Sequence, residues 1–295
     1  MLRISTVSFP GLGIGEFRLN SVAFTIFGVE IAWYAILITL GMIAAVIYTV
    51  YMANKIGITA EDVIDYAIWV IPLGIIGARL YYVLCELDNY HSFIDVINIR
   101  NGGLAIYGGI IAGGLAVLLV SWRKKINFLA FADCVCPGVI LAQGVGRWGN
   151  FMNGEAFGAA TDIFCRMGLR NAEVFDKFGT SELVCVHPTF LYESLWNFLG
   201  FILVNLYVKF VGKKYDGQVF VMVFGWYGLG RAFIEGLRMD SLYTNLFGLE
   251  FRTSQVLAAA IFIVAAAVLT YFAIKKPMKP LYYKKSDKKS KKGNK

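Results

Sequence analysis

The chain has 295 residues, of which 58% are hydrophobic and only 16% charged, and its mean hydropathy is +0.62. These values are far from those of an average soluble domain and indicate an integral membrane protein with several spans. The net charge of +8 comes mostly from lysines in residues 275–295, a Lys/Ser/Gly stretch for which we expect disorder near an anionic membrane surface and no binding of nucleic acid.

Seven apolar runs are long enough to cross a bilayer, whose hydrocarbon core requires about 20 residues per helix. They lack the alternation of apolar and polar residues that is typical of barrel strands. The runs are Ile31–Ala53, Val63–Cys85, Leu104–Trp122, Phe128–Trp148, Thr189–Val208, Gln218–Ile234 and Val256–Ile274. The sequence therefore predicts an all-α integral membrane protein with seven transmembrane helices, which form one polytopic domain over residues 1–274.

Basic residues are distributed unevenly between the two sets of connecting loops, and cytoplasmic loops usually carry the excess. The set that includes residues 275–295 holds more than twice as many lysines and arginines as the other. We therefore expect a cytoplasmic C-terminal tail, an N-terminus outside and an external segment at about residues 149–188. The first 30 residues lack the pattern of a cleaved signal peptide, so we expect them to be retained, with the short apolar stretch 22–29 at the membrane interface.

Three polar side chains in the first three runs are candidate site residues. Tyr34 begins the first run, where an interfacial belt residue is common, although its hydroxyl would also suit a polar cavity. Arg79 lies near the outer end of the second run, so it either extends to the interface or forms a structural or functional ion pair. Tyr107 is flanked by the glycine pairs 102–103 and 108–109, which favour close helix packing and also leave space around its hydroxyl.

The fourth run ends in an unusually polar stretch, residues 146–158. A span ends at lower cost in lipid on Trp and Lys than on a guanidinium, two carboxamides and a carboxylate. These groups belong to Arg147, Asn150, Asn153 and Glu155, which are close enough in sequence to converge on one point. The pattern indicates a site for an anionic, oxygen-rich ligand.

Further charged residues lie near the fifth and sixth runs. Glu193 shares a helix face with Asn197 and requires a partner inside the bundle. Arg231 and Glu235 are four residues apart, which also suits a local ion pair at the membrane edge. Arg147 and Arg231 belong to different helices at one depth, and two such guanidinium groups would bind a phosphate diester through paired hydrogen bonds.

The five cysteines do not form a metal-binding pattern, and the sequence also lacks a P-loop and a dinucleotide-binding motif. Cys134 and Cys136 lie in the apolar fourth run, where a thiol is usually a small buried hydrophobe. Cys165 and Cys185 lie in the predicted external segment, where the sequence leaves a disulfide open.

A transporter or flippase for an anionic lipid is the alternative function, because arginines within spans also mark substrate pathways. Many transporters consist of paired halves, and we find no repeat between residues 31–148 and 189–274. A purely structural membrane protein would not require so many polar groups on one side of the bilayer.

The polar stretch is also the basis of a resemblance to a known family. Gly146-Arg147-Trp148-Gly149-Asn150-Phe151-Met152-Asn153-Gly154-Glu155-Ala156-Phe157-Gly158 matches, at every defined position, the signature G-R-x-G-N-F-x-N-x-E-x-x-G of the bacterial prolipoprotein diacylglyceryl transferases. Other blocks that resemble the family are Trp33-Tyr34, Gly77-Ala78-Arg79, residues 102–109, His187-Pro188 with Leu191-Tyr192-Glu193, and Gly230-Arg231 through Glu235 and Arg238. Tyr107 is a departure, because many members carry at that position a histidine proposed as a catalytic base.

The resemblance implies transfer of the diacylglyceryl group from phosphatidylglycerol to the lipobox cysteine thiol of a preprolipoprotein signal peptide. A thioether forms and glycerol phosphate is released, at the outer face of the bacterial plasma (inner) membrane, with no metal or other cofactor. The implied catalytic residues are Arg147, Arg231, Tyr107 and Glu155, and the base for the thiol stays open among Tyr107, Glu155 and His187. The implied substrate-binding residues are Arg147, Asn150, Asn153, Gly158, Tyr34, Arg79, His187, Tyr227, Glu235 and Arg238.

Overall fold

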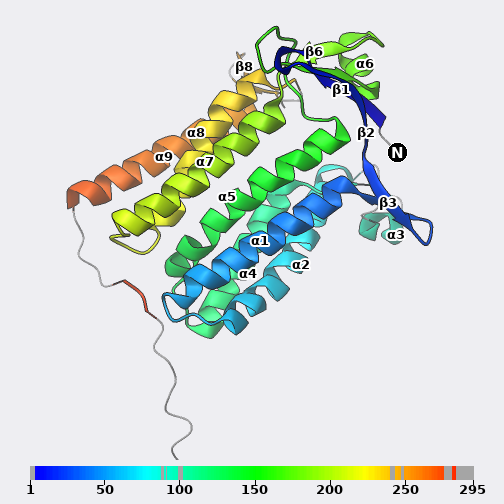
Figure 1. Cartoon of the computed structure of the whole chain (residues 1–295). Helices are drawn as coiled ribbons and strands as arrows, with labels where there is room; N and C mark the ends of the chain where they lie inside the picture. The colour runs from blue at the N-terminus through cyan, green and yellow to red at the C-terminus, as the bar shows by residue number, and fades with distance from the viewer. Residues whose placement is uncertain are drawn as a thin grey trace, which may run out of the picture. The chain divides into compact units, whose positions relative to one another are not determined.

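The computed structural model describes residues 4–87, 90, 92–98, 102–239, 243–246, 249–275 and 281–283. The helices in this part of the chain are α1 (Trp33–Asn54), α2 (Ala60–Cys85), α3 (Phe93–Ile97), α4 (Ile106–Lys124), α5 (Phe128–Asn153), α6 (Ala172–Phe178), α7 (Thr189–Phe210), α8 (Gln218–Ile234) and α9 (Thr253–Lys275), with the short 3-10 helices η1 (Pro10–Leu12) and η3 (Glu235–Leu237) (Figure 1). The strands are β1 (Ile4–Phe9), β2 (Ile14–Asn20), β3 (Val22–Ile26), β4 (Val29–Ala32), β5 (Met167–Arg170), β6 (Val184–Val186), β7 (Tyr243–Leu246) and β8 (Leu249–Arg252). The chain forms two compact units, a first unit of Met1–Ala45 with Val135–Lys279 and a second unit of Val46–Cys134 with Pro280–Lys295.

Six of the described helices are long and apolar enough to cross a membrane, namely α1, α2, α4, α5, α7 and α9. This confirms a mostly helical protein with several membrane spans. Helix α8 coincides with the sixth predicted run, but its 17 residues extend only about 26 Å, somewhat less than a hydrocarbon core of roughly 30 Å. The prediction of seven spans therefore stays a prediction for α8, and so does the orientation of the chain ends.

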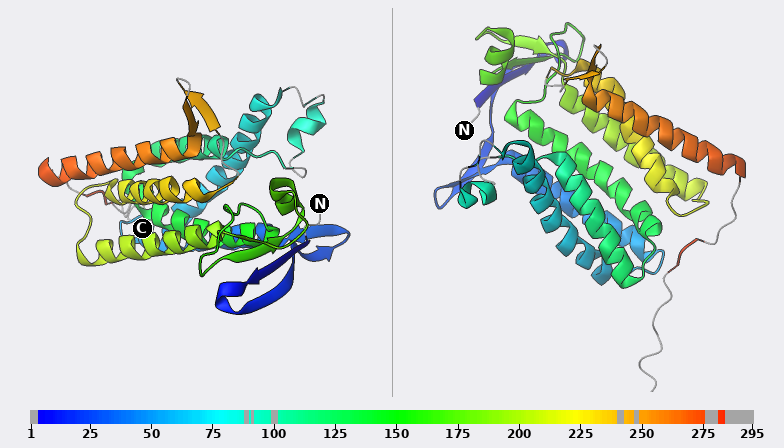
Figure 2. Two further views of the ribbon diagram at one scale, coloured as in Figure 1. Left: turned by 90° about the horizontal axis from the view of Figure 1, so that it is seen from above. Right: turned by 180° about the vertical axis from the view of Figure 1, so that it is seen from behind.

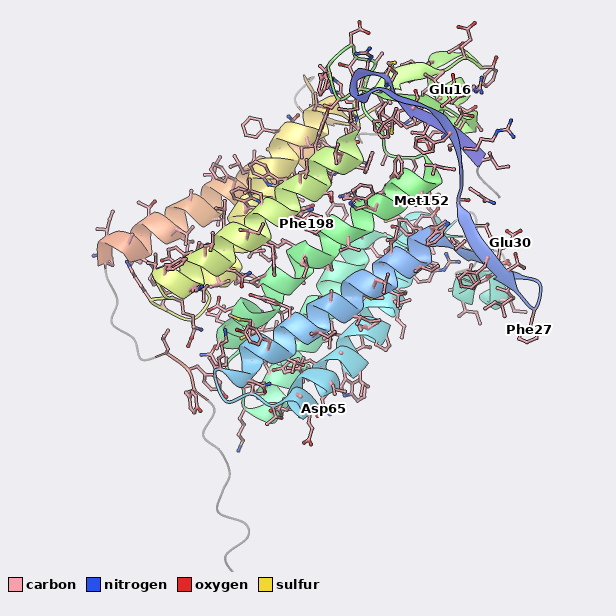
Figure 3. The ribbon with its side chains drawn as sticks, viewed as in Figure 1. Glu16, Phe27, Glu30, Asp65, Met152 and Phe198 are labelled. Carbon is pink, nitrogen blue, oxygen red and sulfur yellow. The ribbon has the colours of Figure 1, made fainter. Side chains whose placement is uncertain are left out.

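In the second unit, α2 and α4 pack closely because glycines face each other. A Cβ atom added to Gly108 would lie 2.2 Å from the carbonyl oxygen of Gly77, so a larger residue would force the helices apart. At the end of α4, the Lys124 Nζ atom is 3.0 Å from a carboxylate oxygen of Asp62 and 2.5 Å from one of Asp65 (Figure 3). These ion pairs join the end of α4 to the start of α2.

In the first unit, α8 packs against both α7 and α9 (Figure 2). Two tryptophans join α7 to α8, because the Trp196 indole N–H donates to the Trp226 carbonyl at 3.0 Å and the Trp226 indole N–H donates to the Trp196 carbonyl at 2.9 Å. Their rings stack with centroids 4.3 Å apart. A buried apolar cluster lies beside them, formed by Cys136, Ile140, Val204, Val219 and Val223.

The first unit also contains an antiparallel sheet, which the all-α prediction missed. Its strand order is β2-β1-β5-β6, so the N-terminal strands pair with the segment between α5 and α7. The apolar residues Val7, Phe157, Met167, Leu169, Val174, Val186 and Phe190 form its core. These strands are only three to seven residues long, so an alternation of apolar and polar residues is too short to be recognised in the sequence.

Residues 22–32, predicted to begin with an interfacial segment, form the β3–β4 hairpin. Phe27 lies fully exposed at its tip (Figure 3). The thiols of Cys165 and Cys185 are free, so the disulfide that the sequence left open is not formed. The prediction of a disordered tail falls outside the described residues, apart from residues 281–283.

Candidate active site

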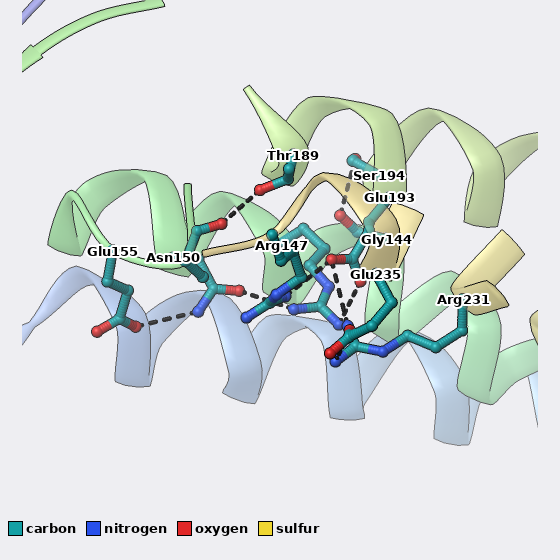
Figure 4. A network of polar contacts seen from close by, with 11 residues as sticks. Gly144, Arg147, Asn150, Glu155, Thr189, Glu193, Ser194, Arg231 and Glu235 are labelled. Carbon is teal, nitrogen blue, oxygen red and sulfur yellow. Dashed lines mark hydrogen bonds and ion pairs between the residues drawn. The ribbon is translucent and has the colours of Figure 1, made fainter. Parts of the chain in front are cut away.

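The last turns of α5 and the residue pair after them hold the polar groups of the signature together (Figure 4). Helix α5 continues to Asn153, beyond the predicted end of the span, so Arg147 and Asn150 lie one helical turn apart. An N–H group of Arg147 donates to the side-chain oxygen of Asn150 at 3.2 Å. Gly154 then adopts a φ of 62°, a left-handed conformation that glycine accepts without strain. The chain thereby turns back, and one oxygen of Glu155 accepts hydrogen bonds from Asn150 at 3.0 Å and from Asn153 at 3.1 Å.

Glu193, in the first turns of α7, lies among three arginines. Its Oε2 atom is 2.5 Å from Nη2 of Arg147, while its Oε1 atom is 3.0 Å from Nη1 of Arg238 and 3.5 Å from Nη1 of Arg231. The Glu193 side chain is only 7% exposed. A carboxylate so buried requires paired charges, and here it holds guanidinium groups from α5, α8 and the residue after η3 at one point.

A second carboxylate supports the same cluster. Glu235 is buried, and its Oε2 atom is 2.6 Å from Nη2 of Arg231, as the i,i+4 spacing predicted. The arginines at 147, 231 and 238 outnumber the two glutamates that hold them, and a fourth guanidinium, that of Arg252, donates to the Glu235 carbonyl. This excess of positive charge favours an anionic group such as a phosphate diester, most strongly where the dielectric is low.

Two aromatic residues complete the surroundings of this cluster. The Tyr34 ring packs on Gly149, where an added Cβ atom would lie 2.6 Å from a ring carbon, so the glycine is required for this contact. Tyr227 lines a small cavity between α7 and α8 together with Glu193, Asn197 and Arg231. The cavity brings together residues that the sequence placed in two separate runs.

Backbone contacts with Gly158 position both Arg238 and His187. Gly158 pairs with Arg238 in an isolated β-bridge, and its N–H donates to the His187 carbonyl at 3.0 Å. A Cβ atom at Gly158 would lie 2.7 Å from that of His187, so no larger residue fits. The His187 Nδ1 atom forms a hydrogen bond with the Tyr192 hydroxyl at 3.2 Å, and burial lowers the pKa of this imidazole.

Arg79 and Tyr107 belong to the second unit and are described there by themselves. All five N–H groups of Arg79 are used by backbone carbonyls, those of Asp95, Val96, Asn98, Gly102 and Gly103, at 2.7 to 3.0 Å. This pattern favours a role in holding the loop before α4 over binding of a substrate phosphate. Tyr107 lies in the first turn of α4 and its side chain is 39% exposed.

Glu193 was not among the predicted site residues. The sequence indicated only that a carboxylate at the start of an apolar run requires a partner, and it did not identify that partner. Among the described residues, no group of three or more His, Cys, Asp or Glu side chains is positioned to hold a metal ion.

Comparisons with known proteins identify the family of the chain. The family model described as prolipoprotein diacylglyceryl transferase matches residues 21–271. A phosphatidylglycerol–prolipoprotein diacylglyceryl transferase of Enterococcus faecalis is 43% identical over 277 residues, which cover 92% of this chain and 97% of the relative. A protein of the same name from Clostridioides difficile is 46% identical over 226 residues, which cover 76% of this chain and 85% of the relative. The chain belongs to the prolipoprotein diacylglyceryl transferase family.

Proposed function

We propose that this chain transfers the diacylglyceryl group of phosphatidylglycerol to the lipobox cysteine thiol of a preprolipoprotein. The thiolate sulfur attacks the glyceryl carbon that carries the phosphate, so that a C–S bond forms as the C–O bond breaks. The electron pair of that bond leaves with glycerol phosphate, and the thiol proton passes to a base. The observation that carries this proposal is the meeting of Arg147 and Arg231 at one buried carboxylate, Glu193.

Arg147 and Arg231 bind the phosphate and stabilise the charge that develops on the leaving oxygen. Each guanidinium has five N–H donors in a planar fork. Asn150 and Glu193 engage only the two terminal nitrogens of Arg147, each of which carries two hydrogens, so the same group can also donate to phosphate oxygens. Because Glu193 already fixes both arginines, they require little reorganisation when the charge develops.

The carboxamides and Glu155 are suited to the hydroxyl groups of the glycerol head group. Glu155 accepts hydrogen bonds from both carboxamides through one oxygen, so these three polar groups lie together next to the phosphate site. Asn150 in turn accepts from Arg147, which links the head-group site to the phosphate site. We therefore assign Asn150, Asn153 and Glu155 to the head group.

Three residues are candidates for the base that accepts the thiol proton. His187 is a candidate because burial lowers its pKa, so the imidazole is neutral near pH 7 and able to accept a proton. Glu155 is the candidate directly connected to the phosphate-binding residues. Tyr107, in the first turn of α4, is the third candidate.

The remaining substrate-binding assignments are of three kinds. Tyr34, Tyr227, Glu235 and Arg238 surround or orient the phosphate-binding arginines. Gly158 acts through its backbone, since it positions Arg238. Arg79 acts on the loop before α4 and thereby on the start of the helix that carries Tyr107.

We also propose the finer topology. Helix α8, extended by η3, crosses the membrane as the sixth of seven spans, with the N-terminus outside, the lysine-rich tail in the cytoplasm and the site toward the outer face of the plasma membrane. The uneven distribution of basic residues supports this orientation. Reporter fusions after Lys214 and Lys276 should be cytoplasmic and one at Lys177 external, and an external tail would overturn the assignment.

The direct test is incubation of the purified protein with phosphatidylglycerol and a lipobox peptide, followed by mass spectrometry. We expect the peptide to gain one diacylglyceryl mass on its cysteine, also in the presence of a chelator. A peptide with the cysteine replaced by serine is the control and should stay unmodified. A protein that moves labelled phosphatidylglycerol between leaflets and leaves the peptide unmodified would instead be a flippase.

A further inference from the structure

One face of α8 connects the phosphate-binding arginine to an apolar surface. Phe220, Phe224, Tyr227 and Arg231 are spaced by four, three and four residues, which places them in one row along the helix. The rings of the two phenylalanines contact each other with centroids 4.6 Å apart. The row therefore begins at Arg231 and ends in an aromatic pair, with Tyr227 between them.

The apolar end of this row lines a groove between α8 and α9. Phe220, Val221 and Phe224 form one wall, and Ala260, Ile261, Val264, Ala265 and Val268 form the other. Every lining side chain is apolar. Small residues keep the two helices close, since a Cβ atom at Gly225 would lie 3.0 Å from that of Ala265.

The dimensions of the groove suit one hydrocarbon chain. Residues 260 to 268 of α9 extend about 12 Å along the helix axis. The cavity volume along this stretch is about 320 Å³. An extended hydrocarbon chain can lie in this elongated, wholly apolar space along the helix axis.

The position of the groove along α8 also matches a lipid whose phosphate lies at Arg231. From Arg231 to Phe220 the helix rises about 16 Å, which is close to the thickness of one leaflet, about 15 Å. An acyl chain that starts near Arg231 would reach its terminal methyl at the level of the aromatic pair. The head-group site and the groove then form one continuous binding site along a single helix face.

We propose that the groove between α8 and α9 binds an acyl chain of the phosphatidylglycerol donor and selects its length. This inference rests on the proposed transferase function. Lipid is as apolar as the groove, so the chain gains little from the hydrophobic effect and selection arises from shape and length. Because α8 and α9 are antiparallel, with Gly225 facing Ala265 and Gly228 facing Ala258, the groove end farthest from Arg231 is lined by Phe220 and Val268, and these two side chains limit its length.

The test is a competition between two donors in one reaction. The wild-type protein and its variants receive a lipobox peptide with equal amounts of dimyristoleoyl and dioleoyl phosphatidylglycerol, which differ only in chain length. Mass spectrometry then gives the ratio of the two lipidated peptides. The ratio is independent of the total activity, so a partly impaired variant is still informative.

We expect Val268→Phe to shift this ratio toward the shorter donor and Phe220→Ala to shift it toward the longer one. Each shift should be about three- to tenfold, at or below the usual selectivity of an apolar pocket for one methylene. Ile263→Ala is the control, because Ile263 is 64% exposed on α9 and does not line the groove. If Val268→Phe yields no product, Val268→Leu adds less volume and is judged by the same ratio.

Ratios equal to that of the wild type in both groove variants would overturn the proposal and identify the occupant as unselected membrane lipid. The same conclusion follows if the control shifts the ratio as much as the groove variants do. Failure of the transferase function has a different result, because then neither donor yields lipidated peptide in the wild-type protein.

Discussion

Replacing Glu193 by glutamine removes the anion at which three arginines meet and changes the side-chain volume very little. Glu193 is 7% exposed, and its contacts to Arg147, Arg238 and Arg231 measure 2.5, 3.0 and 3.5 Å. Removal of one partner from a buried ion pair costs about 3–5 kcal/mol. Arg147 is 23% exposed, so solvent screens part of the repulsion that remains and we expect a loss near 3 kcal/mol.

The measurement is the free energy of unfolding in mixed micelles titrated with a denaturing detergent, with and without inorganic phosphate. Phosphate should stabilise Glu193→Gln more than the wild-type protein, because an anion can occupy the place of the lost carboxylate. Glu16→Gln is the control, since Glu16 is 58% exposed and lies 3.8 Å from Arg170, and such surface pairs contribute about 0–1 kcal/mol. Equal stability of Glu193→Gln and the wild type, or an equal gain from phosphate, would refute the reasoning.

Four further substitutions test the site. Arg147→Lys and Arg231→Lys should each reduce the rate of peptide lipidation about a hundred- to a thousandfold, because a point charge cannot replace the guanidinium fork, and full activity in a folded variant would contradict a bidentate phosphate site. Tyr107→Phe removes only the hydroxyl: a large loss of rate would assign that oxygen to catalysis, whereas nearly normal activity would leave Glu155 or His187 as the base. Burial lowers the pKa of His187 below its usual value of 6.5, so between the folded and the unfolded pKa the unfolded chain binds more protons than the folded one. The free energy of unfolding should therefore decrease as the pH drops below about 6.5. Melting curves of His187→Asn should lack this part of the pH dependence.

The candidate site was largely predictable because its residues follow short-range rules. The signature at residues 146–158 combines charges and amides at the end of an apolar run, and Arg231 and Glu235 share a helix face at i,i+4. Such patterns depend only on the order of residues within one segment. The apolar runs predicted the helices in the same way, and the polar residues at their ends predicted where the site lies.

The contacts of Glu193 and Arg79 were not predictable in the same way. Glu193 meets Arg238 across 45 residues, and the path between them depends on η3 and on the bridge to Gly158. Arg79 binds backbone carbonyls, which every residue carries and which therefore leave no trace in the sequence. The sequence reveals that a buried charge requires partners, and only the fold determines which partners it finds.

Three arginines around one carboxylate repel one another, so the scaffold must hold them there. Two separate features of the scaffold hold the arginines in place. The reciprocal hydrogen bonds of Trp196 and Trp226 fix the register of α7 against α8, and thus of Glu193 against Arg231. The Gly158 bridge fixes the backbone of Arg238. Both features consist of main-chain contacts or packed rings, so they hold the arginines in place independently of a ligand. This supports our proposal that the positive charge is already positioned before the C–O bond of the donor begins to break.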